Sequence, residues 1–194
     1  MIRLARPADA EGMLEIYAPI VRDTWISFEL TPPSAEEFRR RILETLEHAP
    51  WLVDERDGRI AGYAYAKQFW PRPAYQWSVE VTVYVHPEFH RRGIARALYR
   101  SLFLLLRTQG FCKALAVIAL PNPASVFFHE VAGFRPIGVF PAIGYKLGAW
   151  RDIGWWEMTL GDLPLQPFPP RPLTQLTAEE WQSALRRQGE SELP

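Results

Sequence analysis

The sequence Val81-Thr82-Val83-Tyr84-Val85-His86-Pro87, followed by His-Arg-Arg-Gly-Ile-Ala at residues 90–95, sets the architecture. Apolar and polar residues alternate up to the proline, which predicts a strand over residues 77–85. The proline ends this strand, and Gly93 precedes the apolar pattern of a helix over residues 94–108 that Gly110 ends. This order places the free N–H groups of a helix N-terminus beside the end of a strand.

This junction has the features of a phosphate-binding site. The N-terminus of the helix carries unpaired N–H groups and the positive end of the helix dipole. Gly93 removes a side chain where a ligand would touch the backbone, Ala95 is small, and Arg91 and Arg92 add positive charge. Together these features predict a cradle for a phosphate group. The alternative is a solvated start of an amphipathic helix, and the spacing alone does not separate the two.

Strands and helices alternate on both sides of this junction. Strands are expected at residues 1–4, 51–54, 59–68, 77–85, 114–120, 134–140 and 153–160, and helices at residues 10–21, 94–108 and 125–132 and after Ser34. The unbroken apolar run over residues 114–120 is typical of a strand that is covered on both faces. The pattern therefore predicts a mixed sheet with helices on both faces.

Composition narrows the classes of function. The chain has 194 residues, enough for one domain with a hydrophobic core, and its 22 Lys and Arg balance 22 Asp and Glu. Zero net charge argues against nucleic acid and anionic membranes as partners. The single cysteine, Cys112, excludes an internal disulfide and a cysteine-rich zinc site, and no metal is expected. Neither a membrane span nor a signal peptide is evident, so we expect a cytoplasmic protein.

The C-terminal part has a different composition. Six of the 18 prolines lie after residue 160, which predicts an extended arm over residues 161–173. Thr177 and Glu180 have the spacing of a capping box and predict a short helix that ends near Arg187. We therefore expect one domain over residues 1–160 and, over residues 161–194, an arm and helix that pack on this domain or on a partner.

The stretch from Arg91 to Ala95 resembles the R/Q-x-x-G-x-G/A motif of the GCN5-related N-acetyltransferases, the GNAT superfamily. Asn122, followed by His129 and by Gly133-Phe134, matches the same family in order and spacing. The resemblance implies the GNAT fold, an α/β (α+β) fold whose twisted, mostly antiparallel sheet contains one splayed pair of parallel strands. These strands would be Thr82–Val85 and Leu115–Leu120.

The same resemblance implies acetyl-CoA as co-substrate. In this family the loop amides bind its pyrophosphate, and its pantetheine arm lies between the two splayed strands. The cofactor contacts implied in this chain are Val83, Tyr84, Val85, Arg91, Arg92, Gly93, Ile94, Ala95, Arg96 and Asn122.

Further stretches are similar to the phosphinothricin acetyltransferase branch, which includes acetylases of methionine sulfoximine and methionine sulfone. They lie at residues 60–66, 74–77, 82–85, 120–122 and 144–152. The similarity covers roughly residues 1–160 and implies acetyl transfer to the α-amine of a small amino-acid-like acceptor by a homodimer. Two alternatives stay open: a GNAT enzyme for a peptide N-terminus or another amine, and a non-catalytic acyl-CoA-binding module.

Glu80 is the candidate general base. It lies on the strand face opposite the valines, and a carboxylate at such a position is costly unless it is solvated or paired. Acetyl transfer needs a neutral amine, so a carboxylate near the acceptor can take its proton. The resembling enzymes place a catalytic Glu at this position. The alternative is a salt-bridged structural Glu.

His129 is the second catalytic candidate. Many members of the wider family have a Tyr here that protonates the departing CoA thiolate, and a His can donate a proton near neutral pH. The alternative is a His that only forms hydrogen bonds with the cofactor or with its helix neighbours.

The acceptor pocket is expected to include Arg72, Tyr75, Phe28 and Thr82. The resembling enzymes use a basic residue at Arg72 to hold the acceptor carboxylate, which suits the guanidinium fork. A second basic position of the phosphinothricin enzymes is Trp70 here, which argues against doubly anionic phosphinothricin as a good substrate. Phe28 matches a family Phe and, with Trp25, is a candidate for an aromatic wall, although core packing is the alternative. Thr82 shares the strand face of Glu80.

Overall fold

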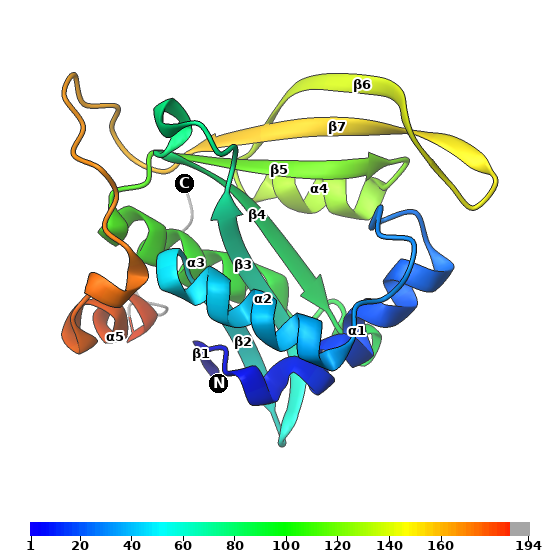
Figure 1. The fold of residues 1–194 in the computed structure, drawn as a ribbon, viewed down its shortest axis with the longest axis horizontal. Coiled ribbons are helices and arrows are strands. Elements are labelled where there is room, and N and C mark those ends of the chain that lie inside the picture. Colours follow the sequence, from blue (N-terminus) through cyan, green and yellow to red (C-terminus); the bar gives the residue numbers. More distant parts are fainter. Residues whose placement is uncertain (187–194) are drawn as a thin grey trace.

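The computed structural model of the protein describes residues 1–186, and seven strands in this part form one sheet in the order β1-β2-β3-β4-β5-β7-β6 (Figure 1). The strands are β1 (Ile2–Leu4), β2 (Trp51–Arg56), β3 (Arg59–Gln68), β4 (Ser78–Val85), β5 (Lys113–Leu120), β6 (Arg135–Lys146) and β7 (Ala149–Thr159). All neighbouring strands are antiparallel except β4 and β5. The mixed sheet predicted from the sequence is therefore confirmed.

Helices cover both faces of this sheet. They are α1 (Ala10–Asp23), α2 (Ala35–His48), α3 (Ile94–Gln109), α4 (Pro123–Val131) and α5 (Ala178–Arg186), with 3-10 turns at Pro7–Asp9, Pro73–Tyr75, Pro87–Phe89 and Leu173–Gln175. Trp51 of β2 packs edge-on against Phe38 of α2, with ring centroids 5.6 Å apart. The next residue, Leu52, belongs to the buried cluster that contains Leu98 of α3. Successive strand residues point to opposite faces, so α2 and α3 lie on opposite sides (Figure 1).

The parallel strands β4 and β5 separate along their length (Figure 1). They pair only at Ser78–Lys113, Val79–Ala114 and Glu80–Leu115. Beyond Glu80, β4 pairs only with β3, and beyond Leu115, β5 pairs only with β7. The splayed strand pair that the resemblance implied is therefore present, and main-chain groups of both strands face the gap between them.

The last two strands are longer than predicted. We expected strands at residues 134–140 and 153–160, but β6 and β7 form a hairpin that also includes most of residues 141–152. The tight turn uses Leu147 and Gly148, with φ of 51° and 75°. Such a turn usually has Asn, Asp or Gly in its first position, so Leu147 gave no turn signal. A register shift between Phe140 and Gly144 also interrupts the alternation of β6.

Helix α4 begins earlier than predicted. We expected its first residue at Ser125, but it starts at Pro123, and the side-chain oxygen of Asn122 accepts a hydrogen bond from the Ser125 N–H at 3.2 Å. Proline suits the first turn of a helix because its missing N–H would have no partner there. Asn122 is therefore the N-cap of α4, whatever else it binds.

The C-terminal arm packs on this chain's own domain. The indole of Trp77 donates to the carbonyl of Phe168 at 2.8 Å. Buried Gln109 of α3 donates its amide to the carbonyls of His48 and Arg171, at 2.7 and 2.8 Å. These bonds tie α2, α3 and the arm together.

The predicted capping box of the last helix is present. The Thr177 N–H donates to Glu180 at 2.8 Å, and the Glu180 N–H donates to the Thr177 hydroxyl at 3.2 Å. The expected end of this helix near Arg187 lies outside the described residues. None of the helices in residues 1–186 is both long enough and apolar enough to span a membrane.

Candidate active site

The N-terminus of α3 is open at the predicted phosphate cradle. Gly93 is its N-cap in the left-handed region, with φ of 76°, and no side chain caps the helix. A Cβ at Gly93 would meet nothing within 4 Å, so the backbone conformation rather than crowding favours glycine. Arg91 also has a positive φ, of 59°. The first turn of α3 thus offers N–H groups that no side chain of this helix start occupies.

A cavity of about 840 Å³ extends from this helix end to the gap between β4 and β5. Nearly all of the predicted cofactor residues line it, namely Val83, Tyr84, Val85, Arg91, Gly93, Ile94, Ala95, Arg96 and Asn122. Arg92 is the exception, and its guanidinium lies 5.3 Å from the centre of the Phe89 ring. We call this space the cofactor cavity.

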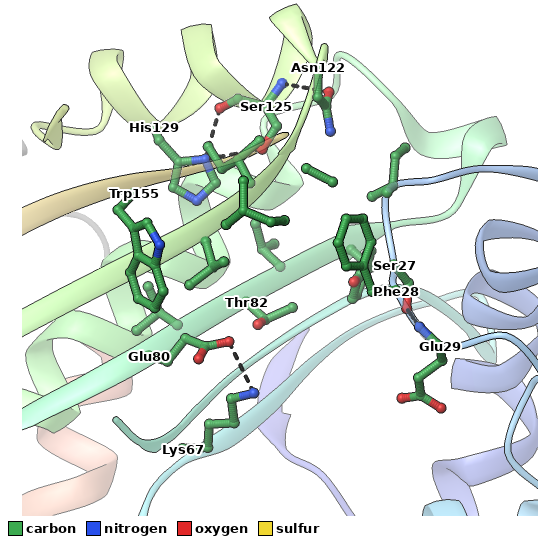
Figure 2. Close-up of a pocket in the computed structure, with 18 of the residues that line it drawn as sticks. Ser27, Phe28, Glu29, Lys67, Glu80, Thr82, Asn122, Ser125, His129 and Trp155 are labelled. Atoms are coloured by element: carbon green, nitrogen blue, oxygen red, sulfur yellow. Dashed lines mark hydrogen bonds and ion pairs between the residues drawn. The ribbon is translucent and has the colours of Figure 1, made fainter. Parts of the chain in front are cut away.

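A second cavity, of about 650 Å³, adjoins the first. Its lining includes Phe28, Glu80 and Thr82, which the sequence had singled out. The two cavities share Ile26, Val83, Tyr84, Asn122, Ser125 and His129, so they meet at the gap between β4 and β5. Figure 2 shows this second space, which we call the acceptor cavity, with side chains from β3, β4, β7, α4 and the segment after α1 around it.

Glu80 projects into the acceptor cavity, where it forms an ion pair. Lys67 of β3 is its cross-strand partner, and Lys67 Nζ lies 3.0 Å from Glu80 Oε1 (Figure 2). Burial is the largest influence on the pKa of Lys67 and lowers it, but attraction to the Glu80 carboxylate and the hydrogen bond to it outweigh burial and leave this pKa raised. The lysine is therefore charged at neutral pH. The Glu80 side chain is 20% exposed, so it is paired without being closed off from the cavity.

His129 forms hydrogen bonds through both ring nitrogens. Its Nδ1 lies 2.8 Å from the carbonyl oxygen of Ser125, so Nδ1 carries the proton that is donated there. Burial lowers the pKa of His129 below its usual value, which favours the neutral ring. The remaining nitrogen, Nε2, then accepts from the hydroxyl of Tyr99 at 2.9 Å. Burial raises the pKa of Tyr99 well above its usual value, so this hydroxyl keeps its proton.

The segment after α1 forms the wall of the acceptor cavity that faces β4 (Figure 2). Phe28 lies against the backbone of Gly144, where a Cβ would come within 2.0 Å of the ring. Buried Lys146 donates to the carbonyls of Val21, Ser27 and Glu29 at 2.6, 2.6 and 2.7 Å. Burial lowers the pKa of Lys146, although Glu29 opposes this shift. We call this set of contacts the Lys146 clamp, because it joins the end of α1 and the cavity wall to the β6–β7 hairpin.

Two predicted acceptor residues lie outside the lining of both cavities. Arg72 is exposed, and Tyr75 packs edge-on against Phe69 and Trp70. Phe69 in turn packs edge-on against Trp155, which lines the acceptor cavity, with centroids 5.7 Å apart. The loop that carries Arg72 therefore reaches the cavity wall through a chain of aromatic rings.

The remaining tryptophans divide among several environments. The indole of Trp25 donates to the carbonyl of Pro121, and the guanidinium of Arg151 lies 4.1 Å from the centre of its ring. Trp156 is buried in the core, whereas Trp150 on the hairpin is exposed. Trp25 therefore lies beside the end of β5 rather than in the cavity lining.

Sequence reasoning missed Lys67, Tyr99 and Lys146. The sequence placed Lys67 in the strand over residues 59–68 and gave it no role in the site. Its position opposite Glu80 depends on the geometry of the loop 69–77, which the sequence pattern does not specify. A lysine at the polar end of an alternating strand was the only local signal. Tyr99 follows the helical pattern of a core residue, and Lys146 lay in a stretch that was not expected to be a strand. Within residues 1–186, no group of three or more His, Cys, Asp or Glu side chains is arranged to hold a metal ion.

Comparison with known proteins gives consistent matches. Residues 2–155 match the family described as Acetyltransferase (GNAT) domain. A phosphinothricin N-acetyltransferase from Streptomyces viridochromogenes is 38% identical over 175 residues, which cover 90% of this chain and 95% of the relative. An L-methionine sulfoximine/L-methionine sulfone acetyltransferase from Pseudomonas aeruginosa is 31% identical over 162 residues, which cover 82% and 94%.

A solved structure matches over a similar length. It is the crystal structure of a GNAT superfamily phosphinothricin acetyltransferase from Sinorhizobium meliloti in complex with acetyl-CoA. The TM-score is 0.84 with 33% sequence identity, and the match covers 90% of this chain and 96% of the other.

Proposed function

Because the chain belongs to the GNAT family of acetyltransferases, we propose that it transfers the acetyl group of acetyl-CoA to the α-amine of a small amino-acid-like acceptor. The family, the N-acetyltransferase activity and acetyl-CoA as co-substrate follow from the match over residues 2–155 and from the named relatives. The observation that carries the finer proposal is the position of Glu80. Its carboxylate projects into a cavity that meets the cofactor cavity at the gap between β4 and β5.

Two features of the fold suit acetyl-CoA, which supplies the activated thioester. The start of α3 has no side-chain cap, so its N–H groups and the helix dipole suit a pyrophosphate. The main-chain groups of β4 and β5 that face the gap between these strands suit the amide groups of a pantetheine arm. In this proposal Val83–Val85 and the turn at Arg91–Arg96 hold the co-substrate. Arg92 adds positive charge from its position over Phe89.

We propose a direct transfer without a covalent enzyme intermediate. Glu80 takes a proton from the acceptor amine, directly or through water, and the neutral amine attacks the thioester carbonyl. A main-chain N–H of β4 near Val83 stabilises the developing oxyanion. The C–S bond breaks as the amide forms, and CoA leaves as the thiol with the proton that the attacking nitrogen releases. Cys112 lines neither cavity, which is consistent with the absence of a cysteine nucleophile from this scheme.

For His129 we propose the second of the two predicted roles. A proton donor would need a charged ring or a free N–H, but burial favours the neutral ring and its Nδ1 proton goes to Ser125. The contact of Nε2 with Tyr99 ties α4 to α3 at the place where the two cavities meet. His129 is thus a positioning residue in this proposal.

The acceptor proposal comes from the named relatives. Phosphinothricin, methionine sulfoximine and methionine sulfone are all amino acids or close analogues with a free α-amine. A homodimer and a cytoplasmic location complete the proposal. The exposed apolar side chains of the β6–β7 hairpin support the first, and the single cysteine in 194 residues supports the second.

Thiol release from acetyl-CoA across a panel of amines tests this proposal. The panel contains methionine sulfoximine, methionine sulfone, phosphinothricin, a peptide N-terminus and simple amines. We expect Glu80→Gln to lower kcat by at least about tenfold, the weak end of general-base effects, with little change in the KM for acetyl-CoA.

Glu157→Gln is the matched control. Glu157 is another ion-paired carboxylate of the sheet, 17% exposed, but it lines neither cavity. We expect it to keep wild-type turnover. Unchanged turnover in Glu80→Gln would remove the assignment of Glu80 as the base.

A further inference from the structure

The acceptor cavity has its own pattern of charge. Among the described residues that line it, the charged side chains are Glu29, Lys67 and Glu80, because His129 is neutral. Glu29 accepts hydrogen bonds from Arg41 at 2.6 Å and from Tyr17 at 2.9 Å, so its charge is already matched. The pair of Lys67 and Glu80 is therefore the positive and negative group that the cavity offers to a ligand.

This pair is complementary in charge to a zwitterion, because its carboxylate can face an ammonium group and its ammonium can face a carboxylate. An α-amino acid carries its ammonium and carboxylate groups on one carbon, and Lys67 Nζ and Glu80 Oε1 are 3.0 Å apart. When such a molecule enters, its ammonium can lie at Glu80 and its carboxylate at Lys67. One ion pair within the protein is then replaced by two between protein and ligand, and Glu80 becomes free to take the proton of the amine.

On this basis we propose that Lys67 binds the carboxylate of the acceptor, and that the enzyme therefore selects α-amino acids over amines that lack a carboxylate. The inference rests on the proposed acetyl transfer to an amino-acid-like acceptor and assigns its recognition to a residue of β3. An amine without a carboxylate would draw Glu80 to itself and offer Lys67 no partner in exchange, so it forms one ion pair with the site where an amino acid forms two. A peptide N-terminus has no carboxylate at its α-carbon and is disfavoured for the same reason.

Lys67 is free to exchange partners. Its side chain is 51% exposed, and ion pairs with such exposure contribute little to stability. Lysine also has a flexible stem and three donors, so a small rotation can turn the ammonium from Glu80 toward a ligand. The predicted carboxylate receptor, Arg72, is exposed and outside the lining of this cavity. Lys67 is thus the cationic side chain that the described cavity presents beside the proposed base.

A matched pair of acceptors tests the inference. L-methionine sulfone and its carboxamide have the same side chain and α-amine, but the carboxamide has no carboxylate. We expect wild type to prefer the acid by at least about tenfold in kcat/KM, the range of a hydrogen bond to a charged group. We expect Lys67→Met to lose most of this preference, because its kcat/KM falls for the acid and not for the carboxamide. We expect Lys67→Arg to keep part of the preference.

Binding provides a second readout. With CoA in place of acetyl-CoA no acetyl group is transferred, and calorimetry should show weaker binding of methionine sulfone to Lys67→Met than to wild type. Lys113→Met is the control, because Lys113 also forms an ion pair across the sheet, with Glu157 at 3.0 Å, but lines neither cavity. We expect it to leave the ratio of acid to carboxamide unchanged.

The outcomes separate the two proposals. An unchanged ratio of acid to carboxamide in Lys67→Met, or equal use of both acceptors by wild type, would overturn the role of Lys67 and leave the proposed function standing. Failure of wild type to acetylate any amine of the panel would overturn the proposed function itself.

Discussion

His129 illustrates how burial limits the chemistry of one residue. Its pKa lies below the usual value because the ring is buried, and both nitrogens already have partners in Ser125 and Tyr99. The residue lines both cavities, at the place where they meet. Its hydrogen bonds depend on how α3 and α4 pack, which no local pattern specifies.

This burial predicts a dependence of stability on pH. The unfolded chain binds a proton at His129 near the ordinary pKa of 6.5, whereas the folded chain binds it only at lower pH. The stabilisation is therefore complete above pH 6.5 and is lost as the pH falls through the window below it. We expect His129→Asn to lose less stability than wild type between pH 7.5 and pH 5.5, as measured by urea unfolding.

A surface histidine provides the control for this measurement. The side chain of His48 is 76% exposed, and we expect His48→Asn to follow the wild-type dependence on pH. A curve for His129→Asn that runs parallel to that of wild type would contradict the assignment of a lowered pKa.

For Glu80, the sequence predicted the face of the strand but not the ion-pair partner, Lys67. Strict alternation along residues 78–85 was enough to place Glu80 opposite the valines, because side chains of a strand alternate between faces. The partner of Glu80 depends on the pairing of β3 with β4. A loop of irregular structure joins these strands, so its length and composition do not set the register.

Among the elements, the start of α3 carries a prediction about the co-substrate. Gly93→Ala adds strain of about 1 kcal/mol, because a residue with a Cβ disfavours the positive φ at this position. Gly93→Glu adds the same strain and also a negative charge at the site proposed for the pyrophosphate. We expect the KM for acetyl-CoA to rise at least about tenfold in Gly93→Glu and much less in Gly93→Ala.

The comparison of the two variants separates charge from strain. The KM for the acceptor should change little in either variant, since Gly93 does not line the acceptor cavity. If Gly93→Glu binds acetyl-CoA as tightly as Gly93→Ala does, the assignment of the cofactor site to this helix end is wrong.

Elements with local end signals were predicted well. Ser34 caps α2 as expected, since its hydroxyl accepts from the Glu37 N–H at 3.1 Å, and Gly110 ends α3. The β6–β7 hairpin was predicted poorly, because its turn has Leu147 where a glycine or asparagine would give a signal. The stretch around this turn showed only a similarity to the family, so the sequence assigned no structural role to Gly144 and Lys146.

For the molecule as a whole, the β6–β7 hairpin is the surface that favours association. β6 is an edge strand of the sheet. Several apolar residues of the hairpin are each at least half exposed, namely Ile137, Val139, Phe140, Ile143, Tyr145 and Trp150. An exposed apolar group of this size is more typical of an interface than of a free surface.

We therefore expect a dimer in solution. Sedimentation equilibrium at micromolar concentration should give twice the chain mass of 22.4 kDa, and Trp150→Lys should shift the protein toward the monomer. Leu165→Lys, on the exposed arm, should leave the mass unchanged and serves as the control. A single species of 22 kDa for wild type would contradict the proposed dimer.

The family resemblance, rather than the periodicity of apolar residues, predicted the overall topology of the sheet. Periodicity supplied the strands and helices and the coverage of both faces, but it contains no information on which strands are neighbours. The separation of β4 and β5 after Glu80 and Leu115 follows from long-range pairing. The family motif at residues 91–95 was therefore the part of the sequence from which the strand gap could be inferred.

The Lys146 clamp has a consequence for how new specificities can arise in this scaffold. The ammonium holds the segment through the carbonyls of Val21, Ser27 and Glu29, which every amino acid possesses. Replacement of Ser27 or Phe28 would therefore leave the anchoring bonds intact. Divergent copies of such a gene can exchange the side chains that line this cavity and still keep the same path of the loop.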